Sequence, residues 1–353
     1  MERLGVCMHG VTLTLETNHL PLLAYAREHL NGLVVSPVSS PDVAVKCLWS
    51  QGDWHSDANP FAVSGNGTLN VIGKRMLGNA NELIWLDTLR MPGLQLRFFR
   101  DQEQLQFDLA YHFHPKKGKL DVLPEYEHKK YFSLMSYLVY YPLIWYLENY
   151  RGWTVLHASA LAMAGGGIII GGLGGVGKTT TCVALMQRPG VELMSENLIL
   201  TDGEFIYACY EPIRLDEDSL AMLGANPRGL TPMAFPDGLK KKWLFHLSTN
   251  GVPEKVHPRR MFLPQFAPDR YVINLMPELA AEKMTAMNRL TRELDDYTWY
   301  AAALEMHWPK AGQASQRIEV LRQFMNKVCC LELGIDRSAG LKAVVEDIFA
   351  SIQ

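Results

Sequence analysis

The stretch GLGGVGKT, from Gly172 to Thr179, fits the pattern G-x-x-x-x-G-K-[ST] at every fixed position. The run Ile168–Ile170 just before it is apolar and β-branched, as a buried parallel strand should be. The stretch KTTTCVALMQR that follows is amphipathic, and Pro189 and Gly190 come directly after it. The sequence therefore predicts a strand, a glycine loop and a helix, in this order.

A loop of this kind suits phosphate for a direct physical reason. Glycines let backbone N–H groups converge on phosphate oxygens, and the helix N-terminus adds about half a positive charge. Lys178 would then reach the β- and γ-phosphates, and the Thr179 hydroxyl would coordinate Mg²⁺. A glycine turn that binds nothing is the alternative, but it does not need Lys and Thr directly after its last glycine. The residues expected to bind a nucleotide are Gly172, Gly174, Gly175, Val176, Gly177, Lys178, Thr179 and Thr180.

Composition sets the broad class of the protein. The 353 residues suffice for two domains, and 48% apolar with 20% charged residues is ordinary for a globular chain. The 34 basic and 37 acidic residues give a net charge of −3, which argues against a nucleic-acid surface. The six cysteines show no C-x-x-C pair and no zinc spacing, so we expect free thiols in a reducing cytoplasm. No signal peptide is expected, because the first residues lack a long apolar core.

The run Tyr131–Tyr150 is apolar enough to be mistaken for a membrane span. Serines and Pro142 interrupt it, and its tyrosines lie in the middle rather than only at the ends, where an interfacial belt would place them. We therefore expect a buried aromatic helix, kinked or ended at Pro142, and no membrane partner.

The sequence predicts three parts: a β-rich N-terminal lobe at 1–126, a connecting aromatic helix at 127–152 and a nucleotide-binding domain at 153–353. The lobe alternates in the manner of strands at 11–17, 42–49, 69–78, 81–89, 94–102 and 103–113, with one helix at 20–30. Two groups of polar residues in the lobe are interpreted without a metal. Asp53, His55 and Asp57 indicate a solvated loop, and His112, His114 and Lys116 indicate an exposed strand end and turn.

In the second half, a strand at 191–195 ends in Glu196 and Asn197. Carboxylates at the carboxyl end of a strand beside a phosphate loop can hold Mg²⁺ or orient a nucleophile. A surface turn between the two strands of a hairpin explains the same residues nearly as well. His157, alone among apolar residues, is usually a core histidine in such a setting.

Several cations follow that spacing cannot rank. Any of Arg259, Arg260 and Arg270 could stabilise transferring phosphate charge. The run Lys240–Lys242 could neutralise phosphate or an acidic partner, although such runs are more often solvated strand edges. From 278 to 308 and from 315 to 328 the pattern is helical, 328–336 is a strand, and 338–352 closes the chain as a helix that Asp336 and Ser338 cap.

The order LHASALA, GGGIIIGGLGGVGKTTT and ELMSENLIL resembles the HPr kinase/phosphorylase family, and more closely the HPr-kinase-related serine kinases of bacterial gene clusters. PIRL, KKKWLFHL, FLPQFAPDR and VCCLELGID support the likeness, which covers about residues 153–350. It implies an α/β fold: a P-loop, HPr-kinase/PEP-carboxykinase-like C-terminal domain with a β-rich N-terminal lobe.

The resemblance also implies roles for single residues. It places His157 near the phosphates and makes Lys178, Glu196 and Asn197 catalytic candidates, with Thr179 and Glu196 at the metal. The family has an Asp-led acidic pair where this chain has Glu196-Asn197. Glutamate can still act as a base or a metal ligand, whereas asparagine can neither take a proton nor carry charge.

The function implied is Mg²⁺-dependent transfer of a phosphoryl group from ATP or GTP to a hydroxyl, typically serine, of a protein, peptide or small molecule in the cytoplasm. A nucleotide-binding regulatory or scaffold protein is the alternative, and Asn197 is what favours it. A plain ATPase or GTPase needs a water-positioning residue that the sequence does not identify. Members of this family often form homo-oligomers, although the sequence leaves the oligomeric state open.

Overall fold

The structure is a computed structural model with a mixed α/β fold that contains several sheets. It describes residues 1–51, 59–61, 68–86, 91–101, 104–114, 124–223, 230–233, 241–246 and 252–352. The chain divides into two compact units. The N-terminal unit takes its described residues from Met1–Tyr146 and Asp296–Lys310, and the C-terminal unit from Leu147–Met233, Lys240–Asp295 and Ala311–Gln353.

These units divide the chain differently from the three expected parts. The expected connecting helix at 127–152 contributes to both, since the N-terminal unit extends to Tyr146 and the C-terminal unit begins at Leu147. Residues 296–310, expected in the nucleotide-binding domain, belong to the N-terminal unit. The reason is aromatic packing: Tyr300 is buried, and its ring lies 5.1 Å from Phe98 and 6.1 Å from Phe107. The helical pattern of the sequence predicts that one face of this helix is buried, but it does not identify the segments against which that face packs.

The N-terminal unit contains a nine-stranded sheet in the order β3-β1-β2-β4-β9-β8-β7-β6-β5. Strands β2, β4 and β9 are mutually parallel, and the other pairs are antiparallel. The early helix is present, and strands lie in each predicted stretch, but 69–78 forms the hairpin of β5 and β6 rather than one strand, and residues 87–89 lie outside the described residues. The sequence analysis missed β1 and β3. The bounds are β1 Glu2–Met8, β2 Val11–Thr17, β3 Val34–Val35, β4 Val43–Gln51, β5 Asn70–Gly73, β6 Met76–Gly78, β7 Glu82–Trp85, β8 Leu94–Asp101, β9 Gln104–Phe113 and α1 Leu20–His29.

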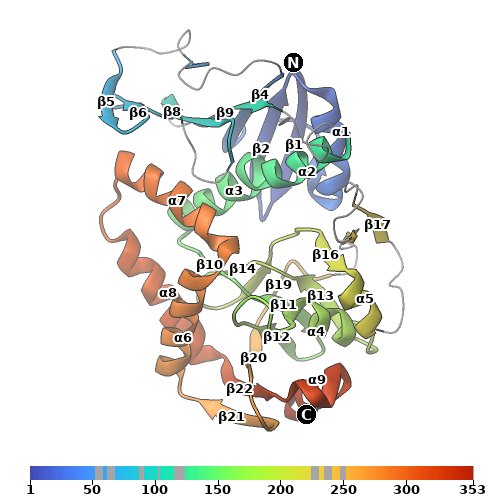
Figure 1. Cartoon of the computed structure of the whole chain (residues 1–353). Coiled ribbons are helices and arrows are strands. Elements are labelled where there is room, and N and C mark those ends of the chain that lie inside the picture. The colour runs from blue at the N-terminus through green and yellow to red at the C-terminus, as the bar shows by residue number, and fades with distance from the viewer. Residues whose placement is uncertain are drawn as a thin grey trace. The chain divides into compact units, whose positions relative to one another are not determined.

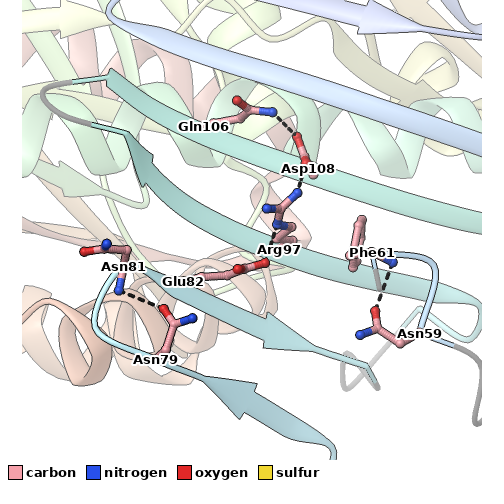
Figure 2. Close-up of polar contacts among 8 residues, drawn as sticks. All are labelled: Asn59, Phe61, Asn79, Asn81, Glu82, Arg97, Gln106 and Asp108. Carbon is pink, nitrogen blue, oxygen red and sulfur yellow. Dashed lines mark hydrogen bonds and ion pairs between the residues drawn. The ribbon is translucent and has the colours of Figure 1, made fainter. Parts of the chain in front are cut away.

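A charged cluster is buried in this sheet, across β7, β8 and β9 (Figure 2). Arg97 donates from Nε to Glu82 Oε1 (2.5 Å) and from Nη1 to Asp108 Oδ2 (3.2 Å). Gln106 donates to the other Asp108 oxygen (2.8 Å). Glu82 is 1% exposed, and Arg97 and Asp108 are 5% exposed. Burial raises the pKa of the Asp108 carboxyl, although Gln106 and Arg97 oppose this effect.

The aromatic stretch is helical throughout. It comprises α2 (Pro124–Met135), a π-helical segment (Ser136–Tyr140), α3 (Tyr141–Tyr146) and a second π-helical segment (Leu147–Arg151). We expected Pro142 either to kink the helix or to end its first half, and it does not end the helix. Instead, a wider π turn precedes this residue, which cannot donate a backbone hydrogen bond to the turn before it. Among the described residues, no helix combines the length and apolarity needed to cross a bilayer.

The C-terminal unit is built on a six-stranded sheet in the order β13-β11-β12-β20-β22-β21. Strands β12, β20 and β22 are parallel, and β11 runs antiparallel to both β12 and β13. Strands β13, β12, β20 and β22 therefore all end at one edge of the sheet, which we call the carboxyl edge. The bounds are β11 Ser159–Met163, β12 Gly166–Ile170, β13 Glu192–Ser195, β20 Pro258–Phe266, β21 Tyr271–Leu275 and β22 Cys329–Ile335.

Helices cover both faces of this sheet (Figure 1). Ile168 and Ile170 pack in one core with α4 (Lys178–Leu185) and α9 (Gly340–Ile352). Ile169 packs in a second core with residues of α6 and α8. Because β12 is buried on both faces, its sequence is a continuous apolar run rather than an alternating one. Helix α6 spans Pro277–Leu290 and α8 spans Gln313–Lys327.

Smaller elements complete the unit, and residues 296–307 of one helix belong to the N-terminal unit instead. The helical pattern from 278 to 308 forms two helices, α6 and α7 (Arg292–His307), because Thr291 between them is extended. Lys242 lies on β18 opposite Asp216, and Lys240 lies outside the described residues. The remaining elements are β10 Thr154–Leu156, β14 Ile199–Thr201, β15 Ile206–Ala208, β16 Ile213–Asp216, α5 Glu217–Leu223, β17 Leu230–Pro232, β18 Lys242–Phe245 and β19 Lys255–Val256.

Candidate functional site

The glycine loop joins the end of β12 to the start of α4, as predicted. Its backbone needs glycine at three points, because φ is +115° at Gly172, +83° at Gly175 and +88° at Gly177. A Cβ added to Gly174, Gly175 or Gly177 would meet no described atom within 4 Å. These glycines therefore serve the path of the chain and not close packing, and the space beside the loop is open.

Helix α4 begins at Lys178 with Gly177 as its N-cap, so no side chain caps it. The first N–H groups of a helix lack partners within the helix, and Ser, Thr, Asp or Asn usually supplies an acceptor. An anion in the loop would supply the same acceptors and would be favoured by the helix dipole.

The Lys178 side chain folds back over the loop. It is only 7% exposed, and its ammonium donates to the carbonyl oxygens of Gly172 (3.0 Å) and Leu173 (2.9 Å). These bonds hold the positive charge beside the N-terminus of α4. The loop thus combines a fixed cation with a helix N-terminus that no side chain caps, which is an electrostatic environment for an anion.

Glu196 lies at the first turn of α4. Its carboxylate accepts a hydrogen bond from the Thr179 hydroxyl, and its main-chain carbonyl accepts one from Ser159. The hairpin interpretation of this turn is wrong, because β13 pairs with β11 whereas β14 pairs with β10 and β15. The turn instead passes from one sheet to another and presents Glu196 at the carboxyl edge.

The hydroxyl of Ser195, the residue before this turn, holds the turn in place. Ser195 is fully buried, and its Oγ accepts from the Cys209 N–H at 3.0 Å. The same oxygen lies within donating distance of the carbonyls of Leu198 (2.5 Å) and Cys209 (2.7 Å). The Glu196-Asn197 turn is therefore tied to the segment that follows β15.

That segment carries a carboxylate that the sequence analysis did not identify. Asn197 Nδ2 donates to Glu211 Oε2 at 3.1 Å, so the Asn197 amide orients the Glu211 carboxylate. The only signal in the sequence was an acidic residue before Pro212 after a short strand, with no motif spacing to single it out. Two neighbouring residues of this turn thus engage separate partners: Glu196 accepts from Thr179, and Asn197 donates to the second carboxylate, Glu211.

His157 also lies at the carboxyl edge. It follows β10 and precedes Ser159, which pairs with Ile170 at the end of β12. The His157 side chain is buried, and its backbone N–H donates to Asn288 Oδ1 on α6 at 3.1 Å. Thr180 differs from the other loop residues, because its buried hydroxyl faces Ser219 on α5 at 3.4 Å. Only the backbone of Thr180 is then left to serve a ligand in the loop.

The arginine candidates are all bound to α9. Arg259 donates to the Ile352 carbonyl at 2.9 Å and Arg260 to that of Ser351 at 3.2 Å. Both arginines are at the start of β20, which is parallel to β12, so they lie at the edge of the sheet opposite the loop. The expectation that either could stabilise phosphate charge is therefore wrong for this arrangement.

Arg270 follows β20 at the carboxyl edge but pairs with Asp347 of α9, at 2.5 and 3.0 Å.

Within the described ranges, no group of three or more His, Cys, Asp or Glu side chains is placed to hold a metal ion. In the N-terminal unit, His114 is exposed and stacks on His112, whose Nδ1 lies 2.9 Å from Ser50 Oγ. Asp53, His55, Asp57 and Lys116 lie outside the described residues.

The cysteines take no part in this chemistry. All six are free, and Cys182 and Cys209 beside the site are fully buried. Burial raises the pKa of Cys182 to about 12, so this thiol on α4 stays protonated.

No protein-family model matches this chain, and no curated protein matches it either.

Proposed function

We propose that the C-terminal unit is an HPr-kinase-like phosphotransferase that binds a nucleoside triphosphate with Mg²⁺ and transfers its terminal phosphoryl group to a hydroxyl. The observation that carries this proposal is the pair of contacts at the start of α4. Lys178 closes over the loop carbonyls, and Thr179 binds the Glu196 carboxylate. A glycine turn with only a structural role has no need for both contacts.

The oxygen ligands of the site fit Mg²⁺. Thr179, Glu196 and Glu211 offer a hydroxyl and two carboxylates, and Mg²⁺ prefers hard oxygen ligands together with water and substrate phosphates. When bound, the ion would be held by these oxygens and would offset the negative charge of the phosphates. Because phosphate and water oxygens complete the coordination of Mg²⁺, the protein need not place three His, Cys, Asp or Glu side chains together before the nucleotide binds.

The transfer itself asks little covalent chemistry of the protein. The acceptor oxygen attacks the γ-phosphorus, and its new O–P bond forms as the bond to the β,γ-bridging oxygen breaks. The nucleoside diphosphate leaves with that electron pair, and the proton of the hydroxyl passes to Glu196. Lys178 and the loop amides hold the phosphates in line, and Glu211, oriented by Asn197, supports the metal.

A nucleotide-binding regulatory protein is the second candidate. The observation in its favour is that Asn197 replaces the second acid of the family's pair and uses its amide to hold Glu211. In this case the site would bind the nucleotide and change the state of the chain without transferring the phosphoryl group.

The test uses the full chain with Mg·ATP and Mg·GTP. Calorimetry measures binding, release of nucleoside diphosphate measures turnover, and mass spectrometry of candidate hydroxyl acceptors measures transfer. Lys178→Ala should abolish binding, whereas Lys342→Ala, on an exposed part of α9, should leave it unchanged. Glu196→Gln should keep binding and lose transfer. Glu211→Gln should raise the Mg²⁺ concentration needed for activity.

The outcomes separate the candidates. Binding that depends on Lys178 without turnover in the presence of acceptors would favour the regulatory protein. Turnover to phosphate without an acceptor would indicate a hydrolase. A wild-type chain that binds neither nucleotide would refute the proposal altogether.

A further inference from the structure

The carboxyl edge carries different chemistry on the two sides of the glycine loop. Along the sheet the order is β13, β11, β12, β20, β22. Glu196 follows β13 on one side of the loop. On the other side, β20 ends at Phe266, and Arg337 comes two residues after β22. Ile170 at the end of β12 pairs with Phe262, so β20 runs four residues further to Phe266, and β22 ends beside Phe266 at Ile335. With a rise of about 3.3 Å per residue and neighbouring strands about 5 Å apart, Phe266 lies roughly 14 Å from the end of β12.

This order sets the direction of a bound nucleotide. The terminal phosphate and the metal belong on the side of Thr179 and Glu196, because those residues offer the oxygen ligands. The nucleoside must then leave the loop on the opposite side, over the ends of β20 and β22. The loop already touches that side, since a Cβ on Gly172 would lie 3.4 Å from Pro264.

Phe266 and Arg337, which we call the aromatic platform, lie at the ends of these two strands. Phe266 is 50% exposed, which is high for a large apolar side chain at the end of a central strand. The Arg337 guanidinium carbon lies 5.1 Å from the centre of the Phe266 ring, in cation–π geometry. Both residues belong to the C-terminal unit.

Backbone contacts hold the platform in position. Phe266 pairs with Ile335 across β20 and β22, and the next N–H, of Ala267, donates to the Ile335 carbonyl at 3.0 Å. Asp336 accepts from the Ser338 N–H at 2.8 Å, which fixes the turn that carries Arg337. The two side chains are thus presented from a rigid edge of the sheet and not from a long loop.

We propose that Phe266 and Arg337 bind the purine base of the nucleotide: the base stacks on the aromatic ring in place of the guanidinium, which turns to the edge of the base. This assignment rests on the proposed function, because it extends the same nucleotide site. Stacking on an aromatic ring tolerates either purine. The donors of Arg337 match the N7 and O6 acceptors of guanine, so GTP is measured beside ATP.

The experiment compares ligands with and without a base on the full chain. Mg·ATP, Mg·GTP and magnesium tripolyphosphate are titrated into the wild type, Phe266→Ala, Phe266→Tyr and Arg337→Gln. Phe266→Ala should weaken the binding of both nucleotides by roughly 5- to 100-fold and leave tripolyphosphate unchanged. Phe266→Tyr should retain wild-type affinity, and Arg337→Gln should weaken GTP at least as much as ATP. Ile318→Ala, an exposed apolar position on α8, is the matched control.

Each contrary result identifies what has failed. Equal nucleotide affinity in Phe266→Ala and the wild type would refute the platform while leaving the phosphate site in place. Equal losses for nucleotide and tripolyphosphate would also refute it, because the residue would then act on the loop and not on the base. If the wild type bound none of the three ligands, the proposed function would fall and this inference with it.

Discussion

The substitution Asn197→Asp places a second carboxylate directly against that of Glu211. Asn197 Nδ2 now donates to Glu211 Oε2 at 3.1 Å, and the variant replaces this donor with a negative oxygen. Without a metal ion the two charges repel each other and the hydrogen bond is lost. We therefore expect the metal-free variant to be less stable than the wild type and Mg²⁺ to recover much of the loss.

The size of the effect follows from the distance. Two unit charges 3.1 Å apart interact by about 5 kcal/mol at an effective dielectric constant of about 20. Uptake of one proton limits the cost, because protonating a carboxyl with an ordinary pKa at pH 7 costs about 4 kcal/mol. We expect a loss of about 2–4 kcal/mol at pH 7. The pair's folded pKa is raised, so the loss should be small below about pH 4 and grow as pH rises through the raised pKa.

Denaturant unfolding of the full chain at pH 5 and pH 7 measures this, once with EDTA and once with MgCl₂. Asn274→Asp, at an exposed position on β21, is the control and should show no dependence on Mg²⁺. An unfolding free energy unchanged in EDTA would contradict the contact between Asn197 and Glu211. A loss that Mg²⁺ does not reduce would show that these carboxylates do not hold the metal.

Three further substitutions test the supporting structure. Ser195→Ala leaves the buried Cys209 N–H without its acceptor and should cost about 1–3 kcal/mol in denaturant unfolding. Gly177→Ala, at φ +88°, should cost about 1 kcal/mol of strain and more than about tenfold in nucleotide affinity, because it adds a methyl group at the N-cap of α4, where we propose that phosphate binds. Gly190→Ala, at φ +74°, carries the same strain and should leave calorimetric affinity unchanged. Asp108 has a raised pKa, so wild-type stability should fall relative to Asp108→Asn as pH rises above about 4, which parallel unfolding curves would show.

The sequence predicted the features that local rules control. The spacing of Gly172 and Gly177, the apolar run before them and the amphipathic stretch after them predict a strand, a loop and a helix without reference to the rest of the chain. The position of Glu196 followed from a general rule on the carboxyl ends of strands. The closing strand and helix, β22 and α9, were equally accessible, because each is a single regular pattern.

The errors at the site concern contacts between segments distant in sequence. Glu211 joins the site only because Ser195 ties two strand ends together, and no pattern in the sequence encodes that hydrogen bond. Arg259 and Arg260 could be excluded only once the direction of β20 relative to the loop was known. A sequence identifies candidate side chains, but the sheet topology determines which of them share an edge.

The formal charges at the site favour joint binding of the metal and the nucleotide that we propose for it. Lys178 contributes one positive charge and the N-terminus of α4 about half of another, against the negative charges of Glu196 and Glu211. A triphosphate alone would therefore approach two carboxylates, whereas Mg²⁺ alone would approach a fixed ammonium. Each ligand supplies the charge that the other needs, so each should raise the affinity for the other by the same factor. Asn197 fits this balance, because a third carboxylate at this position would strengthen the hold on the metal and oppose the phosphates.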